Sequence, residues 1–206
     1  TLIKNVQVVD GTGKTPYGAD VLIKNDRISA IGNFGKKGAD VTVDGRGANL
    51  APGFINVNTD SDHYLTIFDN PAQQDFLLQG VTTIFGGMCG ASLAPLLYGS
   101  LESIRKWVDP NKINVGWRTV AEFLDVLSSR PLGVNFGTLV GHGTIRRALI
   151  GETLRDLTEN EIIIFQNILK KSLEEGAYGL STGLGYAHTR QTPYSELKSL
   201  VQVVSG

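Results

Sequence analysis

The chain has 206 residues, of which 41% are hydrophobic, so it is long enough for one sizeable domain, or one and a half, around a real core. Its 19 basic and 20 acidic residues give a net charge of −1 without any basic block, which argues against nucleic acid as a partner. No apolar run of membrane-spanning length is present, so we expect no membrane partner, and the single cysteine, Cys89, excludes an internal disulfide and favours a cytoplasmic location.

The two ends of the chain indicate a piece of a longer protein. The first residues, TLIKNVQVVD, lack the cationic flank and the long apolar run of a signal peptide. The chain starts at Thr1 rather than at a methionine, and it stops at Gly206 directly after an amphipathic run. We therefore expect that both ends were cut.

Residues 1–50 carry the pattern of short β-strands. The segment ADVLIKNDRISAIG contains two apolar alternations joined at Asn25–Asp26, which is a strong hairpin signal. No stretch with a helical period occurs in this part of the chain. The pattern predicts several strands of a small sheet or sandwich.

From Pro52 onward, strands and helices alternate. The predicted strands cover 54–59, 81–87, 134–143 and 177–186. The predicted helices cover 71–79, 100–108, 119–127, 158–176 and 192–204. Strands of nearly continuous apolar residues between helices predict a parallel sheet that is buried on both faces.

The number of these units sets the predicted architecture. Four strand–helix units over about 155 residues amount to half of an eight-unit barrel, which takes about 250 residues. We therefore predict an α/β chain with two domains. Residues 1–50 form a β-rich small domain, part of a β-sandwich, and residues 51–206 form the first half of a TIM-like (β/α)8 barrel.

Polar residues collect where each predicted strand ends. In chain order they are Asn58, Asp60, Asp62 and His63, then Met88 and Cys89, then His142, and finally Ser181, Thr182, Tyr186 and His188. The carboxyl ends of parallel strands share one rim, where the sites of α/β enzymes lie. Asp, Cys and His brought to one rim make a candidate metal site.

Each of these residues also has an ordinary structural interpretation. Cys89 suits a small core residue, and His142 suits a backbone-bonded turn between two glycines. Asp60 and Asp62 suit a solvated loop or a helix N-cap. His188, in the loop before the last helix, is expected to be exposed. The residues alone leave these alternatives open.

Four segments together resemble a known family. ANLAPGFINVNTDSD, QGVTTIFGGMCGASLAP, LVGHGTIR and EEGAYGLSTGLGYA resemble, in order and spacing, the N-acyl-D-amino-acid deacylases (D-aminoacylases) of the amidohydrolase superfamily. The resemblance runs over about residues 1–204. It implies a metal-dependent hydrolase barrel, of which this chain is the first half, preceded by a small β-domain that the family builds from both chain ends.

The resemblance also implies a metal site with altered ligands. The family pattern at the first barrel strand is Pro-Gly-Phe-Ile-Asp-x-His-x-His, and here Asn58 and Asp60 stand at the two histidine positions. Asp60 keeps an oxygen ligand, whereas Asn58 offers only a neutral amide oxygen, a poor ligand for zinc. Cys89 matches the family's zinc-ligating cysteine. We therefore expect Cys89, Asp60 and Asn58 to face the metal, with one zinc ion rather than two.

The remaining implied roles concern the substrate. His142 and Tyr186 match family residues beside the substrate and are expected to bind it. The family's ligand histidines on the fifth and sixth strands, and the aspartate that serves as general base, would lie beyond residue 206. The implied reaction is removal of the acyl group from an N-acyl-D-amino acid or a related small amide. The implied partner is the C-terminal half of the barrel or a second copy of the chain.

Two alternatives accompany this hypothesis. The loss of both histidines also fits an inactive or truncated homologue that acts as a binding or scaffold subunit. A cyclic-amide hydrolase of the dihydroorotase or hydantoinase type is the second alternative. Such enzymes use a carboxylated lysine on the fourth strand, and GAYGLSTGLGY contains no lysine, which argues against this class.

Overall fold

The computed structural model describes residues 1–35, 37–99 and 101–206, which form two compact units, Thr1–Gly53 and Phe54–Gly206. The sequence places this division at residue 50. Among the described residues, no helix combines the length and the apolar character needed to cross a membrane.

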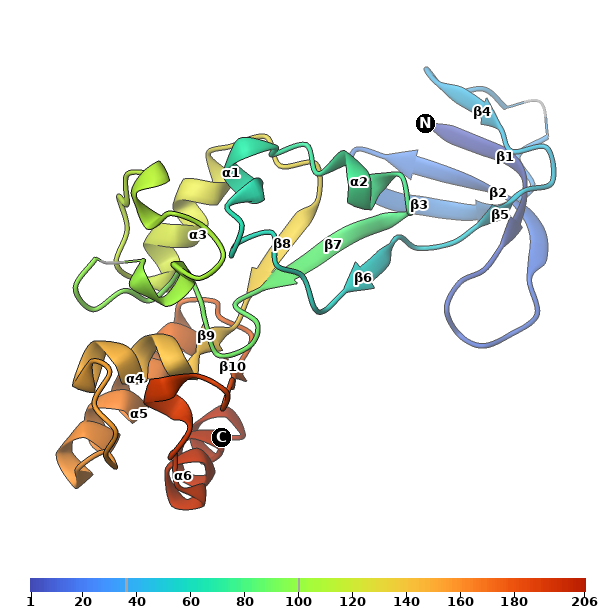
Figure 1. Cartoon of the computed structure of the whole chain (residues 1–206). Helices are drawn as coiled ribbons and strands as arrows, with labels where there is room; N and C mark the ends of the chain where they lie inside the picture. The colour runs from blue at the N-terminus through green and yellow to red at the C-terminus, as the bar shows by residue number, and fades with distance from the viewer. Residues whose placement is uncertain (36, 100) are drawn as a thin grey trace. The chain divides into compact units, whose positions relative to one another are not determined.

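The first unit is a five-stranded sheet. Its strands are β1 (Leu2–Val8), β2 (Tyr17–Lys24), β3 (Arg27–Gly32), β4 (Thr42–Asp44) and β5 (Asn49–Leu50). The order is β3-β2-β1-β4, with β5 also beside β1 (Figure 1). The antiparallel β2–β3 pair is the predicted hairpin, and Asn25 adopts the left-handed conformation, with φ 54°, that its tight turn requires. The predicted β-sandwich stays a prediction.

The second unit carries short parallel strands. They are β6 (Phe54–Asn56), β7 (Val81–Gly86), β8 (Asn135–Thr138), β9 (Val140–Gly141) and β10 (Leu180–Ser181). β6, β7 and β8 form one parallel sheet, and β9 pairs in parallel with β10 (Figure 1). The predicted parallel pairing is confirmed, although the strands are shorter than predicted. The partial (β/α)8 barrel stays a prediction.

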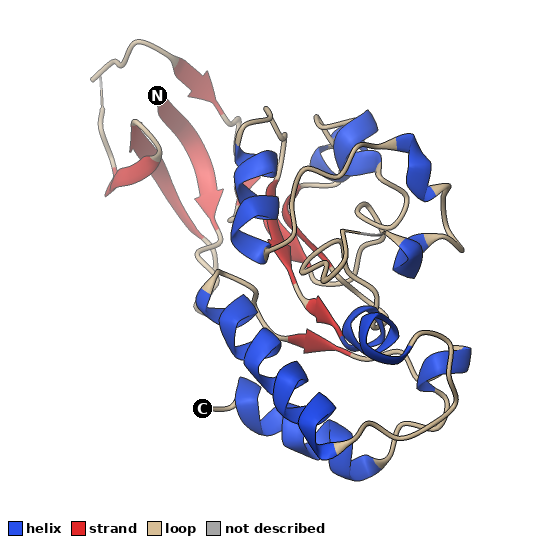
Figure 2. Ribbon diagram, turned by 90° about the vertical axis from the view of Figure 1, so that its left-hand side faces the viewer, coloured by secondary structure: helices blue, strands red, loops and turns tan. Residues whose placement is uncertain are grey.

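Helices and long loops make up the rest of the second unit (Figure 2). They are α1 (Thr66–Asp69), α2 (Gln74–Leu77), α3 (Val120–Ser128), α4 (His142–Ile150), α5 (Glu159–Glu174) and α6 (Tyr194–Val204), with 3₁₀ helices η1 (Glu102–Ile104), η2 (Pro110–Lys112) and η3 (Ala187–Thr189). Both predicted capping boxes are present, because Thr119 and Thr158 exchange hydrogen bonds with the glutamates three residues later.

Two helix predictions need correction, and one helix was not predicted. Residues 71–79 do not form one helix, because Gln73 turns left-handed (φ 45°) and separates the short α1 and α2. The prediction for 100–108 is reduced to η1, and its first residue, Ser100, lies outside the described residues. The sequence pattern also missed α4, whose first residues, His142 and Gly143, were assigned to a strand and its turn.

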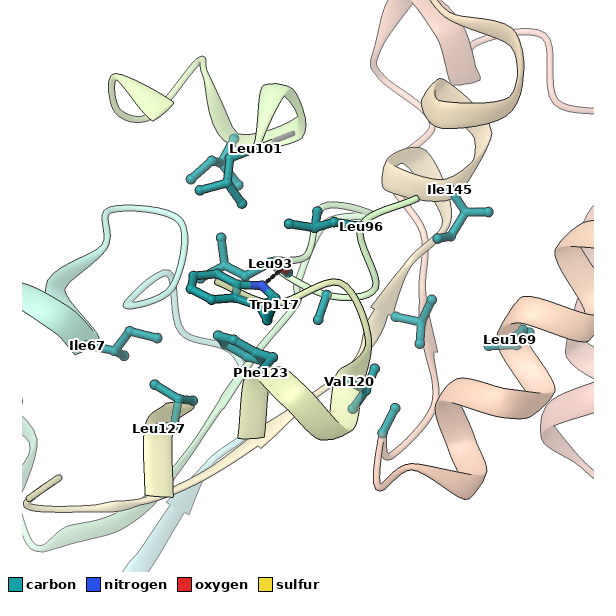
Figure 3. Packing of buried hydrophobic residues seen from close by; sticks show 14 of the residues in the cluster. Ile67, Leu93, Leu96, Leu101, Trp117, Val120, Phe123, Leu127, Ile145 and Leu169 are labelled. Carbon is teal, nitrogen blue, oxygen red and sulfur yellow. Dashed lines mark hydrogen bonds between the residues drawn. The ribbon is translucent and has the colours of Figure 1, made fainter. Parts of the chain in front are cut away.

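The main core of the second unit gathers around Trp117. Figure 3 shows its indole N–H donating to the carbonyl oxygen of Leu93, at 2.6 Å, with the buried Phe123 beside it. Strand β6 lies outside this core, since Phe54 is 64% exposed and Ile55 is 62% exposed. The prediction that all the strands are buried on both faces is therefore wrong for β6.

Candidate metal and substrate site

The segment after β7, residues 87–91, is the meeting point of the strand ends, and we call it the Cys89 turn. The loop after β6 reaches it twice. The backbone N–H of Gly87 donates to Asp62 Oδ2 at 2.6 Å, and His63 Nε2 lies 2.9 Å from the carbonyl oxygen of Ala91. These bonds bring the first two predicted clusters together.

The end of β10 and the loop that follows it also contact the Cys89 turn. Ser181 Oγ accepts a hydrogen bond from the backbone N–H of Gly90 at 3.0 Å and donates to the carbonyl oxygen of Gly87. The hydroxyl of Tyr186 donates to the carbonyl oxygen of Cys89 at 2.8 Å. Residues almost a hundred positions apart in sequence thus share this turn.

Cys89 itself is exposed and adopts a left-handed backbone conformation, with φ 54°. Such a conformation is uncommon for a residue with a side chain. The interpretation of Cys89 as a small core residue is wrong, because its side chain is not buried among aliphatic neighbours. Its role as a metal ligand stays a prediction.

Asn58 and Asp60 lie in the exposed loop after β6. The side chain of Asp60 is 50% exposed, and its Oδ1 lies 2.9 Å from His63 Nδ1. Within the described part of the chain, no group of three or more His, Cys, Asp or Glu side chains could hold a metal ion. The chemistry of the thiol and the carboxylate suits zinc, so these residues fit as part of a ligand set that they do not complete.

The buried pair Asp62 and His63 supports this loop, although the sequence placed neither among the expected ligands. Burial is the main cause that raises the pKa of Asp62, and the nearby His63 opposes this rise. His63 stacks on Trp107 with a centroid distance of 4.2 Å. His63 Nδ1 faces the carboxylate of Asp60 and Nε2 faces the carbonyl oxygen of Ala91, so both ring nitrogens have an oxygen at hydrogen-bond distance.

His142 is fully buried at the start of α4. Its Nε2 lies 2.8 Å from Glu196 Oε1, and Glu196 Oε2 pairs with the buried Arg146. Its ring also stacks on Phe165. No local sequence pattern signals this network, because Glu196 lies 54 residues away on another helix. The expected substrate contact of His142 stays a prediction.

Tyr186 lines a cavity of about 170 Å³ that adjoins the Cys89 turn. Other lining residues include Lys106, Arg147, His188 and the two acidic residues Glu102 and Glu152. His188 is buried, so the expectation that it is exposed is wrong. Burial is the main cause that lowers its pKa, and the carboxylate of Glu152, 3.2 Å away, opposes this.

Comparison with known proteins gives consistent relatives, although no family model matches the chain. The chain is 33% identical to an N-acyl-D-aspartate deacylase and 31% identical to a D-aminoacylase, both from Alcaligenes xylosoxydans xylosoxydans. Each alignment covers 100% of this chain but only 41% and 42% of the two relatives. The chain therefore spans less than half the length of these relatives.

Solved structures of the same kind share the fold. The crystal structure of D-aminoacylase, described as defining a novel subset of amidohydrolases, matches with a TM-score of 0.87 and 29% identity. N-acyl-D-glutamate deacylase from Bordetella bronchiseptica, solved with zinc and a phosphonate inhibitor, matches with a TM-score of 0.87 and 30% identity. Each match covers 99% of this chain and 42% of the other. In sequence and in fold, the chain thus corresponds to the N-terminal part of the proteins of the N-acyl-D-amino-acid deacylase family. This confirms the resemblance that its four motifs carry.

Proposed function

We propose that the chain is the N-terminal part of a zinc-dependent amidohydrolase that removes the acyl group from N-acyl-D-amino acids. The observation that carries this proposal is the exposed thiol of Cys89 at the end of β7, in a chain whose whole length aligns with such deacylases. A reaction that breaks an amide bond needs a polarised carbonyl and an activated water. A bound zinc ion supplies both by acting as a Lewis acid and by lowering the pKa of its water to about 7.

Cys89 is the proposed principal ligand. A thiolate is a strong zinc ligand, and the Cys89 side chain is accessible. Asp60 has a carboxylate oxygen that His63 does not occupy, and it is the proposed second oxygen donor beside Asn58. Histidines and a general base from outside residues 1–206 would complete the set. One zinc ion rather than two follows from the weak donor at Asn58.

The cavity beside the Cys89 turn is the proposed place for part of the substrate. Its wall carries the ammonium group of Lys106, which lies 3.9 Å from the ring centroid of Tyr186. Arg147 also lines the cavity, but its guanidinium group pairs with Glu152, a second lining residue. An N-acyl-D-amino acid is an anion with an apolar acyl group, so Lys106 and the aromatic ring of Tyr186 are the lining groups that suit it. The C-terminal part of the barrel, or a second copy of the chain, is the proposed partner that completes the site.

Zinc content tests the proposed ligand. Purified protein, produced both alone and with the C-terminal part of a related deacylase, is dialysed against buffered zinc and analysed for bound metal. We expect Cys89→Ala to lose most of the bound zinc, because the thiolate is the strongest donor in the described set. Met88→Ala, next to it in the same turn, is the matched control. Zinc that stays bound in full after Cys89→Ala would contradict the proposal.

Hydrolysis of N-acetyl-D-amino acids, compared with their L-enantiomers, tests the reaction in the same co-expressed sample. The relatives that align over the full length of the chain include three deacylases, which supports an enzyme rather than a binding or scaffold subunit. A cyclic-amide hydrolase has support at the level of fold only, since a D-hydantoinase structure is 20% identical with a TM-score of 0.55. Hydrolysis of dihydropyrimidine rings without deacylation would favour that class.

A further inference from the structure

The hydroxyl group of Tyr186 is directed at protein backbone rather than at open space. It donates to the carbonyl oxygen of Cys89, the residue proposed as the metal ligand. Two side chains contact the ring. Lys106 Nζ lies 3.9 Å from its centroid, and His188 stacks on it with an interplanar angle of 9°. A side chain held in this way has little freedom to reorient toward a ligand.

Ser181 holds the same turn from β10. Its hydroxyl accepts from the N–H of Gly90 and donates to the carbonyl oxygen of Gly87, so it connects two residues of the turn on either side of Cys89. The side-chain hydroxyls of Ser181 and Tyr186 thus both bond to the backbone of the Cys89 turn. The left-handed conformation of Cys89 is unfavourable for a residue with a side chain, and these bonds offset that cost.

Gly183 lets the two segments approach closely enough for these bonds. A Cβ atom at Gly183 would lie 2.0 Å from the carbonyl oxygen of Cys89 and 2.8 Å from Tyr186 Cε2. In the same loop, a Cβ atom at Gly185 would meet no atom within 4 Å. The close contact therefore belongs to one glycine and not to the loop as a whole.

We propose that Tyr186 is a positioning residue, which acts with Ser181 and Gly183 to hold the Cys89 turn so that the thiol faces outward at the end of β7. The metal-directed part of this inference rests on the proposed function. The hydroxyl of Tyr186 fixes the ligand-bearing backbone, while its ring still borders the cavity.

Amide hydrogen exchange of the segment 86–92, measured on the whole 206-residue chain, tests the positional claim without any metal. We expect Tyr186→Phe to speed exchange at Gly90 about fivefold, the effect of losing one ordinary hydrogen bond. Tyr194→Phe, at an exposed tyrosine on α6, is the matched control and should leave this segment unchanged. Equal exchange in wild type and Tyr186→Phe would overturn the proposal.

A glycine pair gives a second, independent comparison. Gly183→Ala should disturb exchange in the segment 86–92 more than Tyr186→Phe does, whereas Gly185→Ala should not disturb it. If Gly183→Ala fails to fold, the Tyr186→Phe measurement still decides. An equal change of amide exchange in Gly183→Ala and Gly185→Ala would contradict the close contact between Gly183 and the Cys89 turn.

Cobalt(II) binding tests the metal-directed part of the proposal. The absorption band of a cobalt–thiolate bond shows whether the ion binds Cys89. We expect Tyr186→Phe to weaken cobalt binding about fivefold at an unchanged unfolding midpoint, and Tyr194→Phe to have no effect. Unaltered cobalt affinity in Tyr186→Phe would overturn the metal-directed part. These measurements use the protein produced with the C-terminal part of a related deacylase. If wild type shows no thiolate band in that sample, the proposed function fails instead, and the exchange measurement alone judges the positioning role.

Discussion

The ends of β7 and β9 both present a residue of metal-binding type, and the structure treats the two in opposite ways. At the end of β7, Cys89 is exposed, and its backbone takes up the hydrogen bonds. At the end of β9, His142 is fully buried, and its side chain pairs with Glu196. The end of β7 thus presents an exposed thiol, whereas the imidazole at the end of β9 is buried and forms a contact within the fold.

This difference helps to separate the strand-end residues that are functional candidates from those that stabilise the fold. A polar side chain whose partners are all internal contributes to stability, because a buried polar group without a partner is costly. An exposed side chain on a backbone that is held by hydrogen bonds makes no comparable contribution to stability. By this criterion Cys89 is the stronger functional candidate. His142 joins α4 to α6 through Nε2, but its Nδ1 has no hydrogen-bond partner among the described residues, so its expected substrate contact stays a prediction.

The largest expected effect is at the β9 end. Glu196→Gln removes the charge that pairs with the buried Arg146 and contacts His142. We expect the free energy of unfolding to fall by about 3–5 kcal/mol, because the guanidinium group is then left buried without its counter-charge. Urea unfolding followed by circular dichroism measures this. A loss as small as that of the exposed control Glu159→Gln would return His142 to the candidate site.

A solvated pair of the same chemistry gives the baseline for that effect. Arg155 binds both carboxylate oxygens of Glu161, the capping residue of α5, and these bonds lower the pKa of Glu161 from 4.5 to about 2. Because the folded pKa is the lower one, the stabilisation is complete above pH 4.5 and is lost as the pH falls toward 2.

We expect Glu161→Gln to lower the free energy of unfolding by about 1 kcal/mol at pH 7, a typical capping contribution. The difference from wild type should disappear as the pH falls from 4.5 toward 2. Urea titrations at several pH values check this. A difference that stays constant with pH would show that the charge of Glu161 is not involved.

The smallest expected effects are at the open strand ends. Cys89→Ala and Asn58→Ala should each change the free energy of unfolding by less than about 0.5 kcal/mol, because both side chains are exposed. Thermal unfolding of the metal-free protein measures both. A loss of several kcal/mol in either variant would show that the residue holds the fold together and would weaken its candidacy as a ligand.

Local signals in the sequence predicted the regular parts of the fold. Thr119 and Thr158 begin helices because each capping box closes within four residues, and the hairpin at Asn25 likewise depends on neighbours. The helix expected after Pro71 failed because Gln73 bonds to Thr66 and Asn70 through its side chain and favours a turn. No local pattern signals such a contact.

The site was predictable only in part for the same reason. The positions of Cys89 and Asp60 at strand ends follow from the strand pattern and from family motifs. The pairing of His142 with Glu196, and of Tyr186 with the backbone of Cys89, joins residues separated by 54 and 97 positions. Such pairs arise from packing, and a single sequence does not encode them in any readable spacing.

The exposed strand β6 has a practical consequence. It lies at the end of the described three-stranded sheet, so one row of its backbone N–H and C=O groups has no neighbouring strand, and its apolar side chains face solvent. Edges of this kind template intermolecular β-pairing. We therefore expect concentrated preparations of this chain to aggregate first through residues 54–57. Replacing Val57, which is 63% exposed, with lysine is the simplest way to reduce this aggregation.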